Sequence, residues 1–157
     1  MKLFLKIALA ATFLAAPLTA LAEAVDPAVL APIKQLTEGL NTGAAPKIVG
    51  AHAANPVILD EFTPYLWTGP TAVMGWAADF GKFAAAHGLQ PGPVEIKDPS
   101  VAEVNGDHAY VVAPSVITFK TRDGAIKNAG TFIFTLVKGA DGWKIQSWAY
   151  ARGAVLP

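Results

Sequence analysis

Three short turn signals divide the C-terminal half of the chain, and their spacing constrains the fold more than any other feature. The dipeptides Asn105-Gly106, Asp123-Gly124 and Asp141-Gly142 are residue pairs that tight β-hairpin turns prefer, because they tolerate positive φ. The segments around them are rich in β-branched and aromatic residues and read as strands at 94–104, interrupted by Pro99, and at 108–120, 126–138 and 143–152. Strands joined by such short turns pair with their neighbours in sequence, so this half is predicted to be an antiparallel meander.

The residues before this meander carry helical signals. Asp26-Pro27 combines an N-cap with a proline at the first helical position, and apolar residues then recur every three or four positions from Val29 to Leu40. Because Pro32 lacks the N–H of a helical hydrogen bond, the helix begins either at Pro27 or near Pro32. A short second helix at 46–51 and a strand at 57–59 are predicted to follow.

The clearest helix is predicted over 70–87. Its apolar residues form one stripe, with Asp79 and Lys82 on the other side; the stripe consists of Val73, Trp76, Ala77, Phe80, Phe83 and Ala84. The order of helices, short strand, long helix and meander predicts an α+β fold, in which helices pack on one face of a curved antiparallel sheet. No linker or internal repeat interrupts it, so residues 23–157 are predicted to form a single domain.

The first residues of the chain have the pattern of a secretory signal peptide. Lys2 and Lys6 precede an apolar stretch at 7–18, and Ala20-Leu21-Ala22 is a small-x-small cleavage site. The apolar stretch is shorter than the roughly 20 residues that span a bilayer. We therefore expect cleavage after Ala22, a periplasmic or secreted protein, and no membrane anchor after cleavage.

Composition excludes several classes of function. The chain has no cysteine, and its 12 basic and 12 acidic residues give a formal net charge of 0. Disulfides, thiolate metal sites and a cysteine nucleophile are therefore ruled out, and no basic field favours nucleic acid. The sequence contains no HExxH, no Gly-rich phosphate loop and no G-x-S-x-G motif. We accordingly expect no cofactor and no metal.

Two segments carry a resemblance to a known superfamily. Residues 58–69 (ILDEFTPYLWTG) resemble the strand, acidic residue and Gly-opened helix of the nuclear transport factor 2-like superfamily, and of its SnoaL-like and ketosteroid-isomerase-like members in particular. Residues 142–150 (GWKIQSWAY) are similar to the aromatic-rich strand that follows a turn in these proteins. The resemblance covers 27–152 and implies a cone-shaped α+β barrel with an internal pocket. Members of the superfamily include isomerases, cyclases, hydratases and proteins with no known chemistry, so it implies no single function.

Asp60 is the main candidate for chemistry. It follows the apolar run at 57–59, where the resembled isomerases place their catalytic base, and an apolar surrounding would raise the basicity of its carboxylate. The alternative is that Asp60 only caps the loop. The resembled isomerases hold the enolate oxygen with a tyrosine of the first helix and an acid on a late strand, and neither is present here. Tyr65, Tyr110 and Tyr150 are the candidates to replace these groups, and His52 is a candidate to assist Asp60 in proton transfer.

Aromatic residues are numerous enough to line an apolar pocket. Strand alternation places Gln146, Trp148 and Tyr150 on one face, opposite Ile145, and leaves open which face points into the pocket. The predicted ligand contacts are Tyr65, Trp67, Trp76, Tyr110, Trp148 and Tyr150. Three functions follow: binding of a small apolar or aromatic molecule, general-base catalysis of isomerase, cyclase or hydratase type through Asp60, and an interaction domain. Apolar residues on both faces of the last strands also suggest a homodimer.

Overall fold

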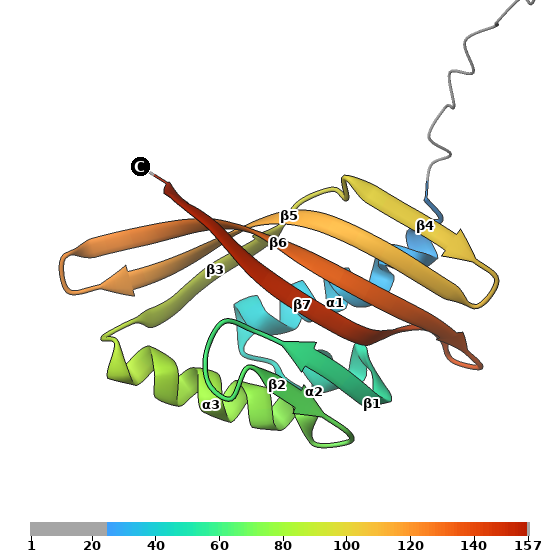
Figure 1. Cartoon of the computed structure of the whole chain (residues 1–157), viewed down its shortest axis with the longest axis horizontal. Coiled ribbons are helices and arrows are strands. Elements are labelled where there is room, and N and C mark those ends of the chain that lie inside the picture. The colour runs from blue at the N-terminus through green and yellow to red at the C-terminus, as the bar shows by residue number, and fades with distance from the viewer. Residues whose placement is uncertain (1–24, 157) are drawn as a thin grey trace, which may run out of the picture.

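The computed structural model describes residues 25–156; the predicted signal peptide and its cleavage site lie outside this range. Three helices cover one face of a curved seven-stranded sheet (Figure 1), which confirms the predicted α+β class. The helices are α1 (Pro27–Thr42), α2 (Ala45–Gly50) and α3 (Ala72–Ala86). The strands are β1 (His52–Leu59), β2 (Leu66–Thr68), β3 (Gln90–Ile96), β4 (Val101–Asn105), β5 (His108–Thr121), β6 (Gly124–Gly139) and β7 (Gly142–Leu156). Within this range no helix combines the length and apolar character needed to cross a membrane.

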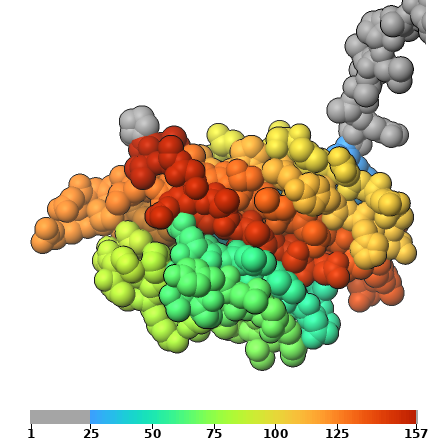
Figure 2. Space-filling view, in the orientation of Figure 1, coloured from blue at the N-terminus to red at the C-terminus, as the bar shows by residue number. Residues whose placement is uncertain are grey.

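The sheet is mixed, so the prediction of an antiparallel sheet is wrong at one strand pair. The strand order is β2-β1-β7-β6-β5-β3, and β4 pairs with the other end of β5. The meander is antiparallel as predicted, but β1 and β7 run parallel, with Ile58 beside Trp148. Figure 2 shows the β1–β2 hairpin packed against β7. Parallel pairing is possible because α3 and the whole meander form the long connection that it requires.

β1 begins earlier than predicted, at His52 rather than Val57. Its first half contains Ala53, Ala54 and Pro56, residue types that are depleted in strands, and its register with β7 shifts before Val57. The strand predicted over 94–104 is likewise two strands, because residues 97–100 leave the sheet between β3 and β4. Both pair with β5 at different places along its length.

The three predicted turns all join neighbouring strands, but the loops are displaced by one residue. The two-residue loops are 106–107, 122–123 and 140–141, because Asn105 pairs with His108, Thr121 with Gly124 and Gly139 with Gly142. Gly106 therefore takes the first loop position, with φ of 59°, where a turn of the II′ family places its glycine. The other two glycines close their hairpins as the first residue of the next strand.

A bulge in β7 overturns one prediction about strand faces. Thr135 pairs with Ser147, whereas the next residue Leu136 pairs with Ile145, so Gln146 is an extra, exposed residue. One inserted residue shifts the alternation by one position. Ile145 therefore lies on the same face as Trp148 and Tyr150, not opposite them, and all three face the helices.

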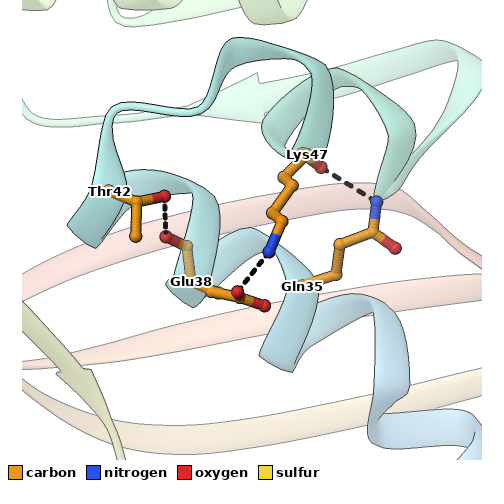
Figure 3. Close-up of polar contacts among 4 residues, drawn as sticks. All are labelled: Gln35, Glu38, Thr42 and Lys47. Atoms are coloured by element: carbon orange, nitrogen blue, oxygen red, sulfur yellow. Dashed lines mark hydrogen bonds and ion pairs between the residues drawn. The ribbon is translucent and has the colours of Figure 1, made fainter.

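The helical layer is anchored at the α1–α2 junction. α1 begins at Pro27, where the Asp26 carboxylate accepts a hydrogen bond from the Ala28 N–H at 2.9 Å, and it continues through Pro32. Figure 3 shows how α2 is held: the Gln35 side chain donates to the Lys47 carbonyl oxygen at 3.0 Å, and Lys47 pairs with Glu38. These contacts hold α2 against α1 shortly before β1 begins at His52.

The core lies between the helices and the concave face of the sheet. Its largest fully buried side chains come from α1 and from β1, β5, β6 and β7; they include Leu36, Ile58, Val111, Phe134, Leu136 and Ile145. The predicted stripe of α3 also faces this core. Phe80 and Phe83 of that stripe are only partly buried, because they border a cavity next to the end of β1.

Candidate functional site

Asp60 lies at the end of β1, where the strand opens into the 60–65 loop. Its two carboxylate oxygens accept hydrogen bonds from uncharged donors: Oδ2 from the indole N–H of Trp76 at 2.8 Å, and Oδ1 from the Glu61 backbone N–H at 2.7 Å. β1 thus delivers the carboxylate to the edge of the core, and α3 orients it. Each oxygen keeps acceptor capacity for a further partner.

Burial controls the ionisation of this carboxyl group. It raises the pKa of Asp60 from 3.8 to about 6, against the opposing effects of the hydrogen bonds from Trp76 and Glu61. The carboxylate form is therefore more basic than that of an ordinary aspartate and is still the main form at neutral pH. A group of this kind can accept a proton or an N–H or O–H hydrogen bond from a bound molecule.

A cavity of about 90 Å³ opens beside Asp60 and is mainly apolar. Its aliphatic lining comes from α1, β3 and β5, and its acidic residues are Asp60 and Glu61. Its seven aromatic residues are Phe62, Trp76, Phe80, Phe83, Phe119, Phe132 and Tyr150. A cavity of this size is smaller than the roughly 150 Å³ that accommodates benzene, so it suits a compact group or one end of a larger molecule.

Tyr150 forms the sheet side of the cavity and is held over Gly130. A Cβ at position 130 would lie 2.5 Å from the Tyr150 hydroxyl oxygen and Cε2, so glycine is needed there for the ring to lie flat on β6. The ring also packs on Phe132, with 5.0 Å between centroids. Burial, with the nearby charges of Glu61 and Asp60, raises the pKa of Tyr150 to about 12. The hydroxyl therefore stays protonated at neutral pH and can donate a hydrogen bond.

Glu61 is the second acidic residue of the lining, and it forms an ion pair. Arg152 of β7 places its Nε 3.1 Å from the Glu61 carboxylate. The Arg152 side chain is about half exposed, so this pair lies at the solvent side of the cavity. Among residues 25–156, by contrast, the hydrogen-bond partners of Asp60 are neutral N–H groups only.

The structure brings three of the predicted site residues together. Asp60, Trp76 and Tyr150 all line the cavity. Trp148, which is only 3% exposed, lies behind Trp76 in an edge-to-face contact at 5.2 Å rather than in the lining. Trp67, which is 7% exposed, packs on Phe62 and donates its N–H to Asp79 of α3 at 3.0 Å, and it does not line the cavity.

The remaining predicted residues lie elsewhere. Tyr65 is 58% exposed at the end of the 60–65 loop. Tyr110 is 41% exposed and lies in a groove with Glu103 and Gln146, on the convex side of the sheet. Neither tyrosine lines the cavity, and Tyr150 is the one of the three candidates that does. Ligand contacts by these residues, and the homodimer, stay predictions.

His52 is buried away from the cavity, and both of its ring nitrogens have partners. Nδ1 donates to the Ile48 carbonyl oxygen at 2.7 Å, and Nε2 accepts from the indole N–H of Trp148 at 3.1 Å. This arrangement requires the neutral tautomer with its proton on Nδ1. Burial lowers the pKa of His52 below 6.5, in keeping with a neutral ring that ties β1 to β7.

Sequence reasoning missed Glu61 and most of the phenylalanines that line the cavity. The pattern of α3 placed Phe80 and Phe83 on its apolar stripe, but it did not identify them as walls of a cavity. Periodicity shows which side of an element faces inward, but not where two layers separate. Gly130 was the available signal on the sheet side, because a glycine within a strand often marks a close approach, here that of the Tyr150 ring.

Within residues 25–156, no three His, Asp or Glu side chains come together as metal ligands would.

Comparison with known proteins gives no matching family model and no matching curated sequence. Solved structures do match. One is a ketosteroid isomerase-like protein from Erwinia carotovora atroseptica, 16% identical over 82% of this chain and 95% of that one, with a TM-score of 0.64.

Two further solved structures agree on the architecture. A hexachlorocyclohexane dehydrochlorinase from Novosphingobium barchaimii is 11% identical over 83% of this chain and 88% of that one, with a TM-score of 0.68. A nuclear transport factor 2-like protein of unknown function from Pseudomonas putida is 14% identical over 77% and 81% of the two chains, with a TM-score of 0.58. Identities this low establish the fold and not the activity. This chain therefore has the nuclear transport factor 2-like fold, which the resemblance in its sequence had predicted.

Proposed function

We propose that this protein binds a small, largely apolar molecule in the cavity beside Asp60. One observation supports this most directly: an aromatic-lined cavity contains a carboxylate whose two hydrogen bonds come from neutral donors. Apolar walls with a few placed polar groups are typical of small-molecule sites. The leader pattern of residues 1–22 adds the proposal that binding takes place in the periplasm or outside the cell.

Filling the cavity tests this proposal. Ile117 lines the cavity, so Ile117→Phe is expected to abolish saturation-transfer NMR signals from tert-butanol, a compact apolar probe, that the unchanged protein gives. Val155→Phe is the matched control, because Val155 is 66% exposed near the end of β7. Equal signals from both variants would contradict the proposal.

Export is tested separately. The protein is purified from the exported fraction, where an N-terminus at Glu23 is expected, and an N-terminus at Met1 would contradict export.

A second candidate is a proton-transfer enzyme, favoured by the pairing of Asp60 with Tyr150. The Asp60 carboxylate, with a pKa of about 6, would take a proton from the carbon next to a ketone carbonyl. The Tyr150 hydroxyl, with a pKa of about 12, would donate a hydrogen bond to the enolate oxygen that forms. Some proteins of the same fold are named as isomerase-like or as dehydrochlorinases.

Isotope exchange tests the enzymatic candidate. In D₂O the protein is expected to replace the hydrogens next to the carbonyl of cyclopentanone by deuterium faster than buffer alone. Asp60→Asn removes the base and is expected to reduce the enzymatic rate by about 100-fold or more, whereas Tyr150→Phe removes only the donor and lowers it less. Exchange that is unchanged in Asp60→Asn would exclude Asp60 as the base, and a rate equal to that of buffer would leave binding alone as the function.

A further inference from the structure

The charges around the cavity are uneven. Its lining contains two carboxylates, Asp60 and Glu61, and seven aromatic rings, and within residues 25–156 none of the lining side chains is a lysine, arginine or histidine. In the described part of the chain the cation paired with these acids is Arg152, which contacts Glu61 from the solvent side. Asp60 faces the cavity with hydrogen bonds from the Trp76 indole and the Glu61 backbone, which carry no formal charge.

Two features of this cavity, its carboxylate and its aromatic rings, favour a positively charged ligand. Removing a carboxylate from water without a positive partner costs free energy, and a bound cation would offset that cost. The faces of aromatic rings are negative because of their quadrupole, and they attract cations most strongly when the rings are tryptophan or tyrosine. Trp76 and Tyr150 are those residues here. The same features disfavour an anion.

The two rings are also held in place before anything binds. The N–H of Trp76 is fixed on Asp60 at 2.8 Å, and its ring stacks on Phe80 with 5.6 Å between centroids. Tyr150 lies on Gly130 and against Phe132. A preorganised site loses less entropy on binding. The volume of about 90 Å³ suits the compact head of a methylated amine better than a planar multi-ring molecule.

We propose that the ligand of this cavity is a small alkylammonium ion, whose charged head lies between Asp60 and the rings of Trp76 and Tyr150. The inference rests on the proposed binding function and names its ligand class. Both a quaternary ammonium and a protonated tertiary amine have this chemistry. They differ in that only the amine can donate a hydrogen bond to Asp60.

Three probes of nearly equal shape test the inference by titration calorimetry at about pH 7.5, above the pKa of Asp60. They are choline, protonated dimethylaminoethanol, and dimethylbutanol, the neutral isostere in which carbon replaces the nitrogen of choline. Both cations are expected to bind roughly tenfold or more tightly than the neutral alcohol. Tighter binding of dimethylaminoethanol than of choline would indicate a protonated amine, and the reverse order a quaternary ammonium.

Matched variants show where the preference originates. Asp60→Asn keeps an oxygen that can accept from Trp76, and it is expected to lower the ratio of choline to dimethylbutanol affinity several-fold, to the part that the rings of Trp76 and Tyr150 supply. Asp79→Asn removes an equal charge that also accepts from an indole, that of Trp67, but lies outside the cavity, so it should keep the preference. Loss of the preference in Asp79→Asn would assign it to overall charge and overturn the inference.

The outcomes also separate this inference from the function on which it rests. If dimethylbutanol binds as tightly as choline, the inference is overturned while binding of apolar molecules stands. If none of the three probes binds, the inference is again overturned. In that case the tert-butanol experiment with Ile117→Phe decides on its own whether the cavity binds small molecules.

Discussion

Replacing Trp148 with alanine is expected to lower the free energy of unfolding by about 3–5 kcal/mol. Trp148 is 3% exposed and packs against Trp76 and Phe132 at centroid distances of 5.2 and 5.6 Å. Its N–H is also the hydrogen-bond donor to His52 Nε2. The substitution therefore opens a void behind the cavity and leaves a buried nitrogen without its donor. Urea unfolding followed by far-UV circular dichroism measures the loss.

Two controls separate the contributions of packing and hydrogen bonding. Trp148→Phe keeps most of the ring contacts but removes the donor, so its cost is expected near the 1–3 kcal/mol of an unsatisfied buried polar group. Tyr110→Ala removes an aromatic ring that is 41% exposed on the convex face and should cost less than either. A loss of stability in Trp148→Ala no larger than that in Tyr110→Ala would contradict this prediction.

Asp60→Asn is expected to stabilise the protein above about pH 6, by roughly 3 kcal/mol at most. Burial raises the pKa of Asp60 to about 6 in the folded protein, against 3.8 for an exposed aspartate. Below pH 3.8 the group is protonated in both states and costs nothing. As the pH rises to about 6 the unfolded chain ionises first, so stability falls across this window and then stays level. Asparagine has no charge to desolvate, so the variant lacks this fall.

The comparison is made by measuring unfolding at several pH values between about 4 and 8. His52 acts in the opposite direction: burial lowers its pKa, so its contribution is present above 6.5 and is lost as the pH falls. Both proteins contain His52, and therefore the difference between their stability curves isolates Asp60. Glu61, Arg152 and Tyr150 are likewise common to both. A difference that does not change with pH would mean that Asp60 is not buried as described.

The meander was predictable because its signals are local. Each hairpin is determined by a turn pair and by alternating residues a few positions apart, so the strands and their order were recovered from Asn105-Gly106 onward. The stripe of α3 was predictable for the same reason. The parallel pairing of β1 with β7 was not, because it joins Ile58 to Trp148 and nothing local in either segment indicates the partner.

The site was only partly predictable, for a related reason. Asp60 was identified because it follows a short apolar strand, and Tyr150 because it lies in an aromatic run. Their proximity depends on β1 lying beside β7, and the role of Phe80 and Phe119 as cavity walls depends on the distance between α3 and the sheet. Trp67 and Trp148 were expected to meet a ligand on aromatic character alone, which does not distinguish a wall of the cavity from the layer behind it.

The extra residue at Gln146 has a consequence for how such a protein can change over generations. Gln146 is the residue without a partner between the Ile145–Leu136 and Ser147–Thr135 pairs. Loss of its codon would close the bulge and leave these pairs, and the inward faces of Ile145 and Trp148, as they are. Loss of the codon for Ala149 would instead place Tyr150 opposite Ile133, on the convex side of the sheet, and remove its ring from the cavity wall. A one-codon deletion is therefore expected to be neutral at one position of β7 and to reshape the cavity three positions later.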